Sequence, residues 1–222
     1  MPFAIVFPGQ GSHRAGMGRA IFAQSPAARE VFARASAALG WDAAAACFAD
    51  DPGALVRTSV TQPALFTAEA AALAALREAG AGKPACAAGH SLGEYTALHA
   101  AGALTVEAGV RLTAARGRLM QEATATSPGA MAAVLGATRD EVGEALARAG
   151  LDGRLYLAAF NAPDQTVVSG DAAAVDALHA AAKDLGLRKV VRLNTAGAFH
   201  SPLMAAAAVA FKTVLDDATI GE

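Results

Sequence analysis

One stretch of the chain has the residue types and spacing of a serine nucleophile, residues 89–93, which read G-H-S-L-G. An apolar run, residues 85–88, precedes it, and a helical pattern that places Leu92, Tyr95 and Leu98 on one face follows it. The order is therefore strand, sharp turn, helix. In such a nucleophile elbow the glycines permit a turn that side chains would block, and the amide after the serine points at a developing oxyanion. The helix N-terminus adds partial positive charge there.

The same residues allow a second interpretation. Ser91 and Glu94 spell S-x-x-E, the capping box that begins many helices, and G-x-S-x-G also occurs by chance. The surrounding chain has to decide between a capped helix and a nucleophile.

A serine nucleophile needs a base, and histidine is the first candidate. Strand alternation would turn His90 away from Ser91, and His99 and His179 fall within helical patterns, where histidines mostly pack or face solvent. His200 lies in a loop rich in Gly, Phe, Ser and Pro just before a helix, where a rigid scaffold can place a side chain. It is the candidate base.

Length and net charge limit the classes of protein to which the chain can belong. The 222 residues can bury a sizeable core, as one large domain or as a large and a small one. The 18 Lys+Arg and 20 Asp+Glu leave a formal net charge of −2, which indicates neither a nucleic-acid binder nor an electrostatic membrane anchor. No run approaches the ~18 uninterrupted apolar residues of a spanning helix, so we expect no membrane segment.

The N-terminus and the cysteines indicate a compartment. Residues 1–7 form an apolar run without a basic leader, which predicts a buried first strand and not a signal peptide, and favours the cytoplasm. Cys47 and Cys86 lack C-x-x-C spacing, so we expect two buried free thiols and neither a disulfide nor a metal site.

The first half of the chain alternates Gly-rich turns with helices. The turn 8–12 follows the first strand but lacks the G-K-[ST] ending of a phosphate loop. A helix is predicted over 26–39, with Gly40 as its stop. A second is predicted from Thr61 to about Gly80, with Pro63 in its first turn. The helix after the elbow ends near Gly102, and another covers 106–123. Two or all three of its arginines could face solvent: Arg111, Arg116 and Arg118.

The second half has a different pattern. Strands are predicted at 131–135, 155–160, 166–169 and 189–193, and helices at 139–149 and 172–185. This is the β-α-β-β-α-β order of a split ferredoxin-like arrangement. The sequence thus predicts an α/β protein: a large α/β-hydrolase-like domain with a parallel sheet and a nucleophile elbow, residues 1–125 and 197–222, into which a small ferredoxin-like domain, residues 126–196, is inserted.

Taken together, the motifs resemble those of the malonyl-CoA:acyl carrier protein transacylase family, in family order over the whole chain. The matching segments are Phe7–Ser12 (FPGQGS), Thr61–Leu65 (TQPAL), Gly89–Tyr95 (GHSLGEY), Arg116–Gln121 (RGRLMQ), Asn161–Gly170 (NAPDQTVVSG) and Phe199–Met204 (FHSPLM). Each segment alone is a weak signal, and six in order are a strong one.

The resemblance implies a role for each matching residue. Ser91 attacks the thioester of malonyl-CoA and His200 is its general base, without an aspartate to complete a triad. Gln10 and the Leu92 amide hold the oxyanion. Arg116 pairs with the malonyl carboxylate through two parallel hydrogen bonds, which sets the acyl choice.

The resemblance extends to the rest of the site and to its partners. Phe199 leaves little room for a 2-methyl branch, and Gln62 and Asn161 line the cleft. The acceptor is the phosphopantetheine thiol of acyl carrier protein, in fatty acid or polyketide synthesis, with coenzyme A thioester as substrate and no bound cofactor or metal. Arg188, Lys189 and Arg192 are a candidate docking cluster, although solvated charge is the simpler interpretation.

Two alternatives stay open. Members of the family ordinarily continue beyond the helix after the histidine with segments that finish the sheet, so this chain is expected to expose apolar surface and a strand edge. It could therefore be an inactive fragment that only binds carrier protein. A G-x-S-x-G esterase is the other alternative, with a third triad member among Asp171, Asp176 and Asp184.

Overall fold

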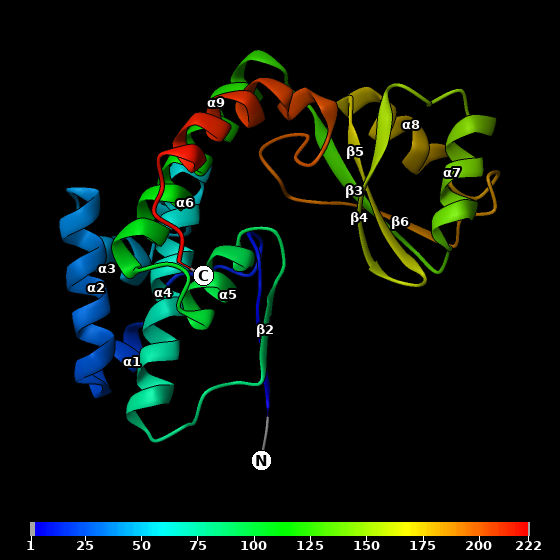
Figure 1. Ribbon diagram of the computed structural model, residues 1–222. Coiled ribbons are helices and arrows are strands. Elements are labelled where there is room, and N and C mark those ends of the chain that lie inside the picture. Colours follow the sequence, from blue (N-terminus) through cyan, green and yellow to red (C-terminus); the bar gives the residue numbers. More distant parts are fainter. Residues whose placement is uncertain (1–2, 222) are drawn as a thin grey trace. The chain divides into compact units, whose positions relative to one another are not determined.

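The computed structural model describes residues 3–221, and its contacts divide the chain into two compact units (Figure 1). The first unit comprises the chain up to Leu119 together with the chain from Phe211 onward. The second runs from Met120 to Ala210. Each unit combines strands with helices around a hydrophobic core of its own, so the fold is α/β as predicted.

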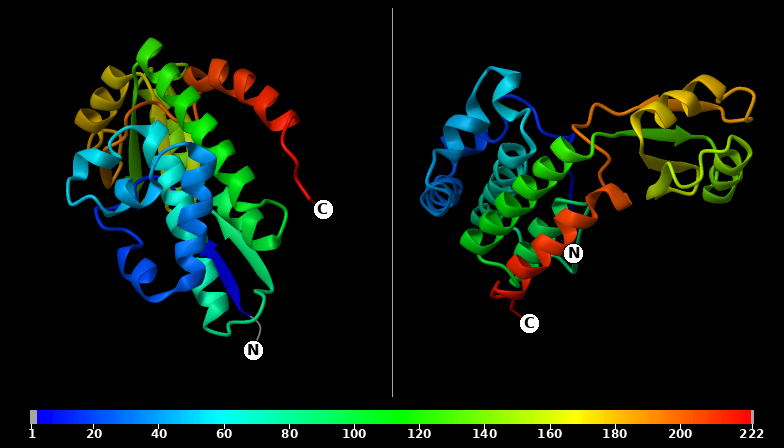
Figure 2. Two further views of the ribbon diagram at one scale, coloured as in Figure 1. Left: turned by 90° about the vertical axis from the view of Figure 1, so that its left-hand side faces the viewer. Right: turned by 90° about the horizontal axis from the view of Figure 1, so that it is seen from above.

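The strands of the first unit are β1 (Ala4–Phe7) and β2 (Cys86–Gly89). They run parallel and side by side, with Ala4 opposite Cys86 and Phe7 opposite Gly89 (Figure 2). Parallel strands need a long crossover, and the residues between these two supply it as helices. Pairing with β2 places the end of β1 directly beside the turn that follows β2.

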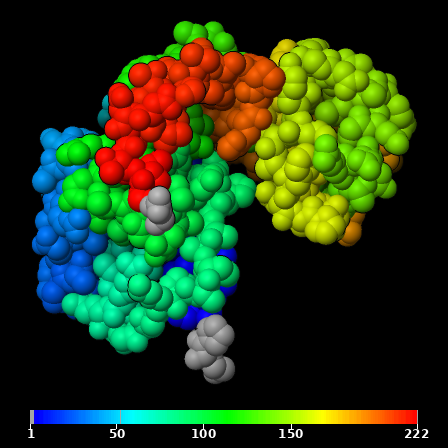
Figure 3. Space-filling model, viewed as in Figure 1, coloured from blue at the N-terminus to red at the C-terminus, as the bar shows by residue number. Residues whose placement is uncertain are grey.

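The prediction of a buried first strand is wrong for most of β1. Phe7 is 7% exposed, but Val6 is 75% exposed. Figure 3 shows the blue atoms of β1 at the surface beside those of residues 80–90. The prediction that Cys86 is buried is also wrong, since its side chain is exposed whereas Cys47 is buried. The reason is that within residues 3–221 this sheet has two strands, so alternate side chains meet solvent.

Helices make up the rest of the first unit. The helix predicted over 26–39 is confirmed as α2 (Pro26–Leu39). The hydroxyl of Ser25 accepts a hydrogen bond from the amide of Ala28 at 3.0 Å and so caps the start of the helix, and Gly40, with φ 74°, ends it. The other elements of this unit are α1 (Arg19–Gln24), α3 (Ala43–Phe48), the short 3-10 helix η1 (Pro52–Leu55), α4 (Thr58–Glu78), α5 (Gly93–Ala101) and α6 (Val106–Thr126), whose last turns belong to the second unit.

Helix α4 begins earlier than predicted. The amides of Val60 and Thr61 both donate to the carbonyl of Arg57, so the first turn forms before Thr61. Pro63 therefore lies inside the helix and not in its first turn, which corrects the prediction. Buried Phe66 and a long run of other buried residues make α4 the central helix of the core, in which α2, α3 and α5 pack against it (Figure 1).

The second unit contains the six elements predicted for it. They are β3 (Ala130–Leu135), α7 (Arg139–Arg148), β4 (Leu155–Ala162), β5 (Gln165–Gly170), α8 (Ala172–Ala181) and β6 (Lys189–Arg192). The sheet order is β4-β5-β3-β6, and each neighbouring pair is antiparallel. Alternate residues of β3 share one core with α7 and α8, so both helices cover the same face.

After β6 the chain forms a loop, a short 3-10 helix η2 (Pro202–Met204) and α9 (Ala205–Asp216). Within residues 3–221 no helix combines the length and the apolar character that crossing a membrane requires.

Candidate active site

The segment after β2 has the geometry of a nucleophile elbow. The amide of His90 continues the ladder by donating to the carbonyl of Phe7 at 3.0 Å, and α5 begins at Gly93. Ser91, between them, has φ 53°. Left-handed backbone at a residue other than glycine is strained by roughly 1–2 kcal/mol, and such strain concentrates at functional sites. The turn therefore holds the serine in a conformation that its own preferences oppose.

The two flanking glycines are required by close backbone approaches. A Cβ atom on Gly89 would lie 2.0 Å from the carbonyl carbon of Gly93, and one on Gly93 would lie 2.2 Å from the carbonyl oxygen of Phe7. Both distances are far below van der Waals contact. The G-x-S-x-G spacing is thus the spacing at which the start of α5 meets both the end of β2 and the end of β1.

The capping-box interpretation of Ser91 is wrong. Helix α5 has Leu92 at its N-cap, and no side chain caps it. The hydroxyl of Ser91 instead accepts a hydrogen bond from Nη2 of Arg116 at 3.0 Å. The serine side chain is engaged by a cation from another helix, which is the environment of a reactive group and not of a cap.

Arg116 connects the serine to α4. Its Nη1 donates to Oε1 of Gln62 at 2.8 Å, and the guanidinium carbon lies 5.8 Å from the centroid of the Tyr95 ring. Burial lowers the pKa of Arg116, and Tyr95 and Glu94 raise it in part. An arginine stays protonated in spite of such shifts, so a half-buried positive charge stands at the serine oxygen.

The hydrogen bonds continue beyond Arg116 as a chain. Nε2 of Gln62, a fully buried side chain, donates to Oε1 of Gln10 at 3.3 Å. Nε2 of Gln10 in turn donates to the hydroxyl of Thr58 at 3.3 Å. The order is Thr58, Gln10, Gln62, Arg116, Ser91. The two helices α4 and α6 and the loops after β1 and β2 therefore contribute to one network.

A close approach of two helices puts Arg116 within reach of this network. A Cβ atom on the next residue, Gly117, would lie 2.5 Å from the carbonyl oxygen of Thr58 at the start of α4. Arg111 and Arg118, on the same helix, are exposed. Two of the three arginines of this helix are therefore exposed, and Arg116 is the one that is not, which is one of the two outcomes that the sequence left open.

The loop of the second unit that carries His200 is tightly held. His200 has φ 58°, and in the part of the chain that the structure describes only Ser91 shares a positive φ among residues other than glycine. The hydroxyl of Ser201 donates to the carbonyl of Ala198 at 2.6 Å, and Phe199 is 5% exposed. A Cβ atom on Gly197 would lie 2.3 Å from Oγ1 of Thr124. The loop is thus packed onto the end of α6.

Asn161 lies on an irregular part of β4. The register against β5 shifts between Phe160 and Ala162, so Asn161 is the extra residue of a β-bulge and is exposed. Bulges re-aim side chains and are common beside active sites. The sequence contained the asparagine but no signal for the bulge.

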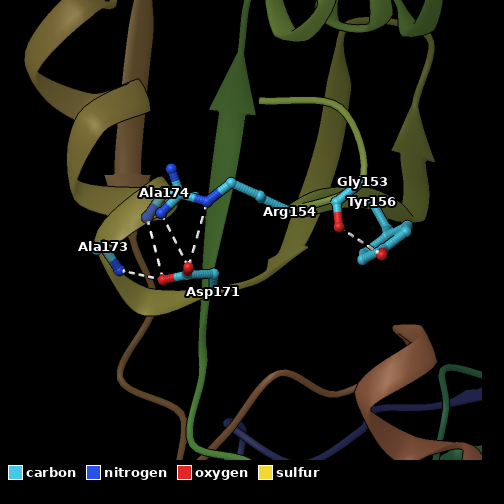
Figure 4. Close-up of polar contacts among 6 residues, drawn as sticks. All are labelled: Gly153, Arg154, Tyr156, Asp171, Ala173 and Ala174. Carbon is cyan, nitrogen blue, oxygen red and sulfur yellow. Dashed lines mark hydrogen bonds and ion pairs between the residues drawn. The ribbon is translucent and has the colours of Figure 1, made fainter. Parts of the chain in front are cut away.

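Two of the three aspartates of the esterase alternative, Asp171 and Asp176, have structural partners. Asp171 caps α8 by accepting from the amide of Ala173 at 2.7 Å, and it pairs with Arg154 at 2.9 Å (Figure 4). These contacts lower the pKa of Asp171. Asp176 pairs with Arg192. Both carboxylates are satisfied by their own unit, which weakens the case for a triad built on either of them.

The structure thus brings together Ser91, Arg116, Gln62 and Gln10 in the first unit, with the amide of Leu92 directly after the serine. His200, Phe199 and Asn161 belong to the second unit. Sequence reasoning missed Thr58 and Tyr95 as members of the network. Tyr95 was assigned only to the apolar face of α5, and Thr58 had no signal, since it lies before the predicted start of its helix.

Known proteins match this chain over almost its whole length. A family model described as "Acyl transferase domain" matches residues 4–221. The malonyl CoA-acyl carrier protein transacylase of Staphylococcus aureus is 42% identical over 202 residues, which is 90% of this chain and 65% of the relative. The chain therefore spans about 65% of the length of that curated relative.

Solved structures agree with the sequence relatives. The malonyl CoA-acyl carrier protein transacylase of Coxiella burnetii superimposes with a TM-score of 0.93 at 40% identity, over 99% of this chain and 70% of its own. A malonyl-transacylase solved in complex with a type II polyketide synthase acyl carrier protein superimposes with a TM-score of 0.92 at 36% identity. The match covers 100% of this chain and 72% of the other.

The fold and the elbow define the class, an acyl transferase domain. Within that class, the chain belongs to the malonyl CoA-acyl carrier protein transacylase family.

Proposed function

We propose that this protein transfers a malonyl group from malonyl-CoA to the phosphopantetheine thiol of acyl carrier protein through a malonyl-serine intermediate. The observation that carries the proposal is the contact between Arg116 and Ser91, 3.0 Å from Nη2 to Oγ. A carboxylate bound to this guanidinium brings the acyl carbon of the same small molecule close to the serine oxygen. Substrate choice and nucleophilic attack therefore depend on one side chain.

The first half-reaction uses Ser91 and His200. The Oγ of Ser91 attacks the thioester carbonyl, and His200 accepts the hydroxyl proton as general base. The tetrahedral intermediate collapses, the C–S bond breaks, and His200 returns the proton to the coenzyme A thiol. The amide of Leu92 and Gln10 stabilise the oxyanion, with the N-terminus of α5 adding positive potential.

Arg116 has two hydrogen-bonding edges for a carboxylate, which in this structure contact Gln62 and Ser91. A malonyl carboxylate would accept from this planar fork, whereas an acetyl group offers nothing to it. Phe199, beside His200, limits the room at C2, and one excluded methyl group is worth ~1–3 kcal/mol of discrimination. Asn161 and Gln62 contact the rest of the substrate.

The second half-reaction reverses the first with a new thiol. The phosphopantetheine thiol loses its proton to His200 and attacks the serine ester, and Ser91 recovers the proton as its ester bond breaks. Kinetics should be of the ping-pong type. The product serves chain extension in fatty acid or polyketide synthesis, and no bound cofactor takes part.

The proposed arrangement assigns the chain to two domains. Residues 1–125 and 197–222 form an α/β-hydrolase-like domain that carries the elbow, and residues 126–196 form a ferredoxin-like domain. The strand order β4-β5-β3-β6 with two helices on one face supports the second assignment. The parallel pairing of β1 and β2 before the elbow supports the first.

Mass spectrometry after incubation with isotopically labelled malonyl-CoA tests the function. The expected result is one malonyl group on Ser91, transferred to holo acyl carrier protein when that is added. No acylation of Ser91 would overturn the proposal and leave the carrier-binding fragment. Fast cleavage of simple esters, unaffected by Arg116→Ala, would favour the esterase.

A further inference from the structure

A carboxyl group is buried at the contact between the two helices that frame the elbow. Glu69 on α4 is 8% exposed, and its Oε2 accepts a hydrogen bond from the hydroxyl of Thr96 on α5 at 2.5 Å. Thr96 is fully buried. The contact joins the helix that follows Ser91 to the helix that carries Gln62.

Within residues 3–221 the other oxygen of Glu69 has no hydrogen-bond partner. Its Oε1 is buried and unsatisfied. An ionised carboxylate can accept about four hydrogen bonds, and one donor in an apolar core is far too few to stabilise the charge. A protonated carboxyl group tolerates the same surroundings much better. The site is therefore built for a neutral carboxylic acid.

Helical geometry links this contact to the active site. Gln62 and Glu69 are seven residues apart on α4, so both lie on one face, about 10 Å from each other along the axis. Thr96 lies five residues after Ser91. Fixing Glu69 against Thr96 therefore fixes the position of α5, and with it the elbow, relative to the Gln62 and Arg116 network.

We propose that Glu69, a buried carboxyl group joined to Thr96 by a hydrogen bond, is a positioning residue for Ser91. The proposal rests on the proposed acyl transfer at Ser91. Glu69 does not contact the substrate: it keeps α5 in register with α4, so that Oγ of Ser91 stays at hydrogen-bonding distance from Arg116. Ionisation of Glu69 would loosen this contact, because the charge could only be solvated by opening the interface between the helices.

Burial and one hydroxyl, and no charged side chain among the described residues, account for the pKa of Glu69. Burial raises its pKa to about 7, the hydroxyl of Thr96 lowers it in part, and no charged side chain contributes. Several titratable groups on the neighbouring helices have partners elsewhere: Arg19 with Asp50, Arg29 with Phe22 and Ala23 carbonyls, Arg34 with Glu107, Cys47 with the Ala64 carbonyl, His99 with the Leu104 carbonyl, and Arg116 with Gln62 and Ser91.

Single-turnover acylation of Ser91 over a range of pH tests the proposal. We expect Glu69→Gln to react at the wild-type rate at about pH 5.5 and several-fold faster than wild type above about pH 8, because the amide cannot ionise. Glu69→Ala should be slowed about tenfold at every pH without a change in KM for malonyl-CoA. The proposal is overturned if the ratio of the acylation rates of Glu69→Gln and wild type stays constant with pH.

Two threonines provide a matched control. Thr67 on α4 is also fully buried, but its hydroxyl donates to the carbonyl of Pro63 within its own helix at 2.7 Å. We expect Thr96→Val to slow acylation and Thr67→Val to leave it unchanged. Equal slowing by both variants would show that any lost buried hydroxyl has the same effect, which overturns the positioning role.

A second measurement separates this proposal from the proposed function. Hydrogen exchange of the amides of residues 92–97 reports the stability of α5 without any substrate. Above about pH 8 we expect faster exchange in wild type than in Glu69→Gln, and equal exchange at about pH 5.5. Failure of malonyl-CoA to acylate wild type would overturn the function alone, whereas equal exchange at both pH values would overturn the role of Glu69.

Discussion

The guanidinium of Arg116 donates a hydrogen bond to the hydroxyl of Ser91 at 3.0 Å, so a positive charge is in contact with the proposed nucleophile. Arg116 reaches this position because Gly117 lets α6 approach the start of α4. Gln62 holds the other edge of the guanidinium at 2.8 Å. The proposed acyl-selecting group and the proposed nucleophile are therefore neighbours, and this relationship leads to the first prediction.

Arg116→Ala should remove the preference for malonyl-CoA. A charged hydrogen bond contributes ~1.5–3 kcal/mol, so malonylation of Ser91 should slow by about 10- to 100-fold while acetyl-CoA gains relative to it. Competition between the two labelled thioesters measures the ratio. Arg111→Ala, on the exposed side of the same helix, is the control and should leave the ratio unchanged. An unchanged ratio in Arg116→Ala would contradict the assigned role.

Ser91→Gly should abolish acylation and stabilise the protein. Glycine adopts φ 53° without the strain that serine has there, which is worth about 1 kcal/mol, or roughly 2–4 °C in Tm for a protein of this size. Thermal unfolding of both proteins measures the shift. Ser91→Ala, which keeps the Cβ atom and loses the nucleophile, is the control with no gain in Tm. A lower Tm for Ser91→Gly would show that the serine is unstrained.

Gly93→Ala should disrupt the elbow. The added methyl group would lie 2.2 Å from the carbonyl oxygen of Phe7, and separating β1 from α5 should cost more than about 2 kcal/mol. Gly143 provides the contrast, because it lies within α7 and a Cβ atom there would meet nothing within 4 Å. Gly143→Ala should be neutral or stabilising by up to ~1 kcal/mol. Urea unfolding compares the two variants.

The pH dependence of stability should reveal Glu69. Its folded pKa of about 7 lies above the ordinary glutamate value of 4.5, so between these values the folded state binds the extra proton. The contribution of Glu69 to the free energy of unfolding is therefore fully present below about pH 4.5. As the pH rises to about 7, this contribution falls by about 3 kcal/mol. The difference in unfolding free energy between Glu69→Gln and wild type should grow by that order across this range. A difference in unfolding free energy that stays constant with pH would mean that burial does not raise the pKa of Glu69.

The two cysteines should differ in reactivity. Cys86 is exposed on β2, whereas Cys47 is buried and burial raises the pKa of its thiol to about 12. The thiolate is the reactive form, so native protein should take up one equivalent of a thiol reagent, at Cys86. Peptide mapping identifies the labelled residue. Labelling of Cys47 in the folded protein would contradict its burial.

Local patterns in the sequence were sufficient for most elements. Ser25, Pro26 and Gly40 determine where α2 begins and ends, because caps and φ preferences act within a few residues. The six elements of the second unit were predicted for the same reason, with boundaries shifted by a few residues. Helix α4 was placed three residues late, because its first turn is stabilised by the Arg57 carbonyl and carries no capping side chain.

The candidate site shows most clearly which features local sequence determines and which ones only the tertiary structure decides. The G-x-S-x-G spacing, together with the apolar run before it and the helical pattern after it, predicted the elbow, and both glycines are required because backbone segments approach each other closely there. It could not choose among Arg111, Arg116 and Arg118, nor pair Glu69 with Thr96. Those choices depend on which helix faces approach each other, and packing between residues far apart in the chain decides that only in the folded protein.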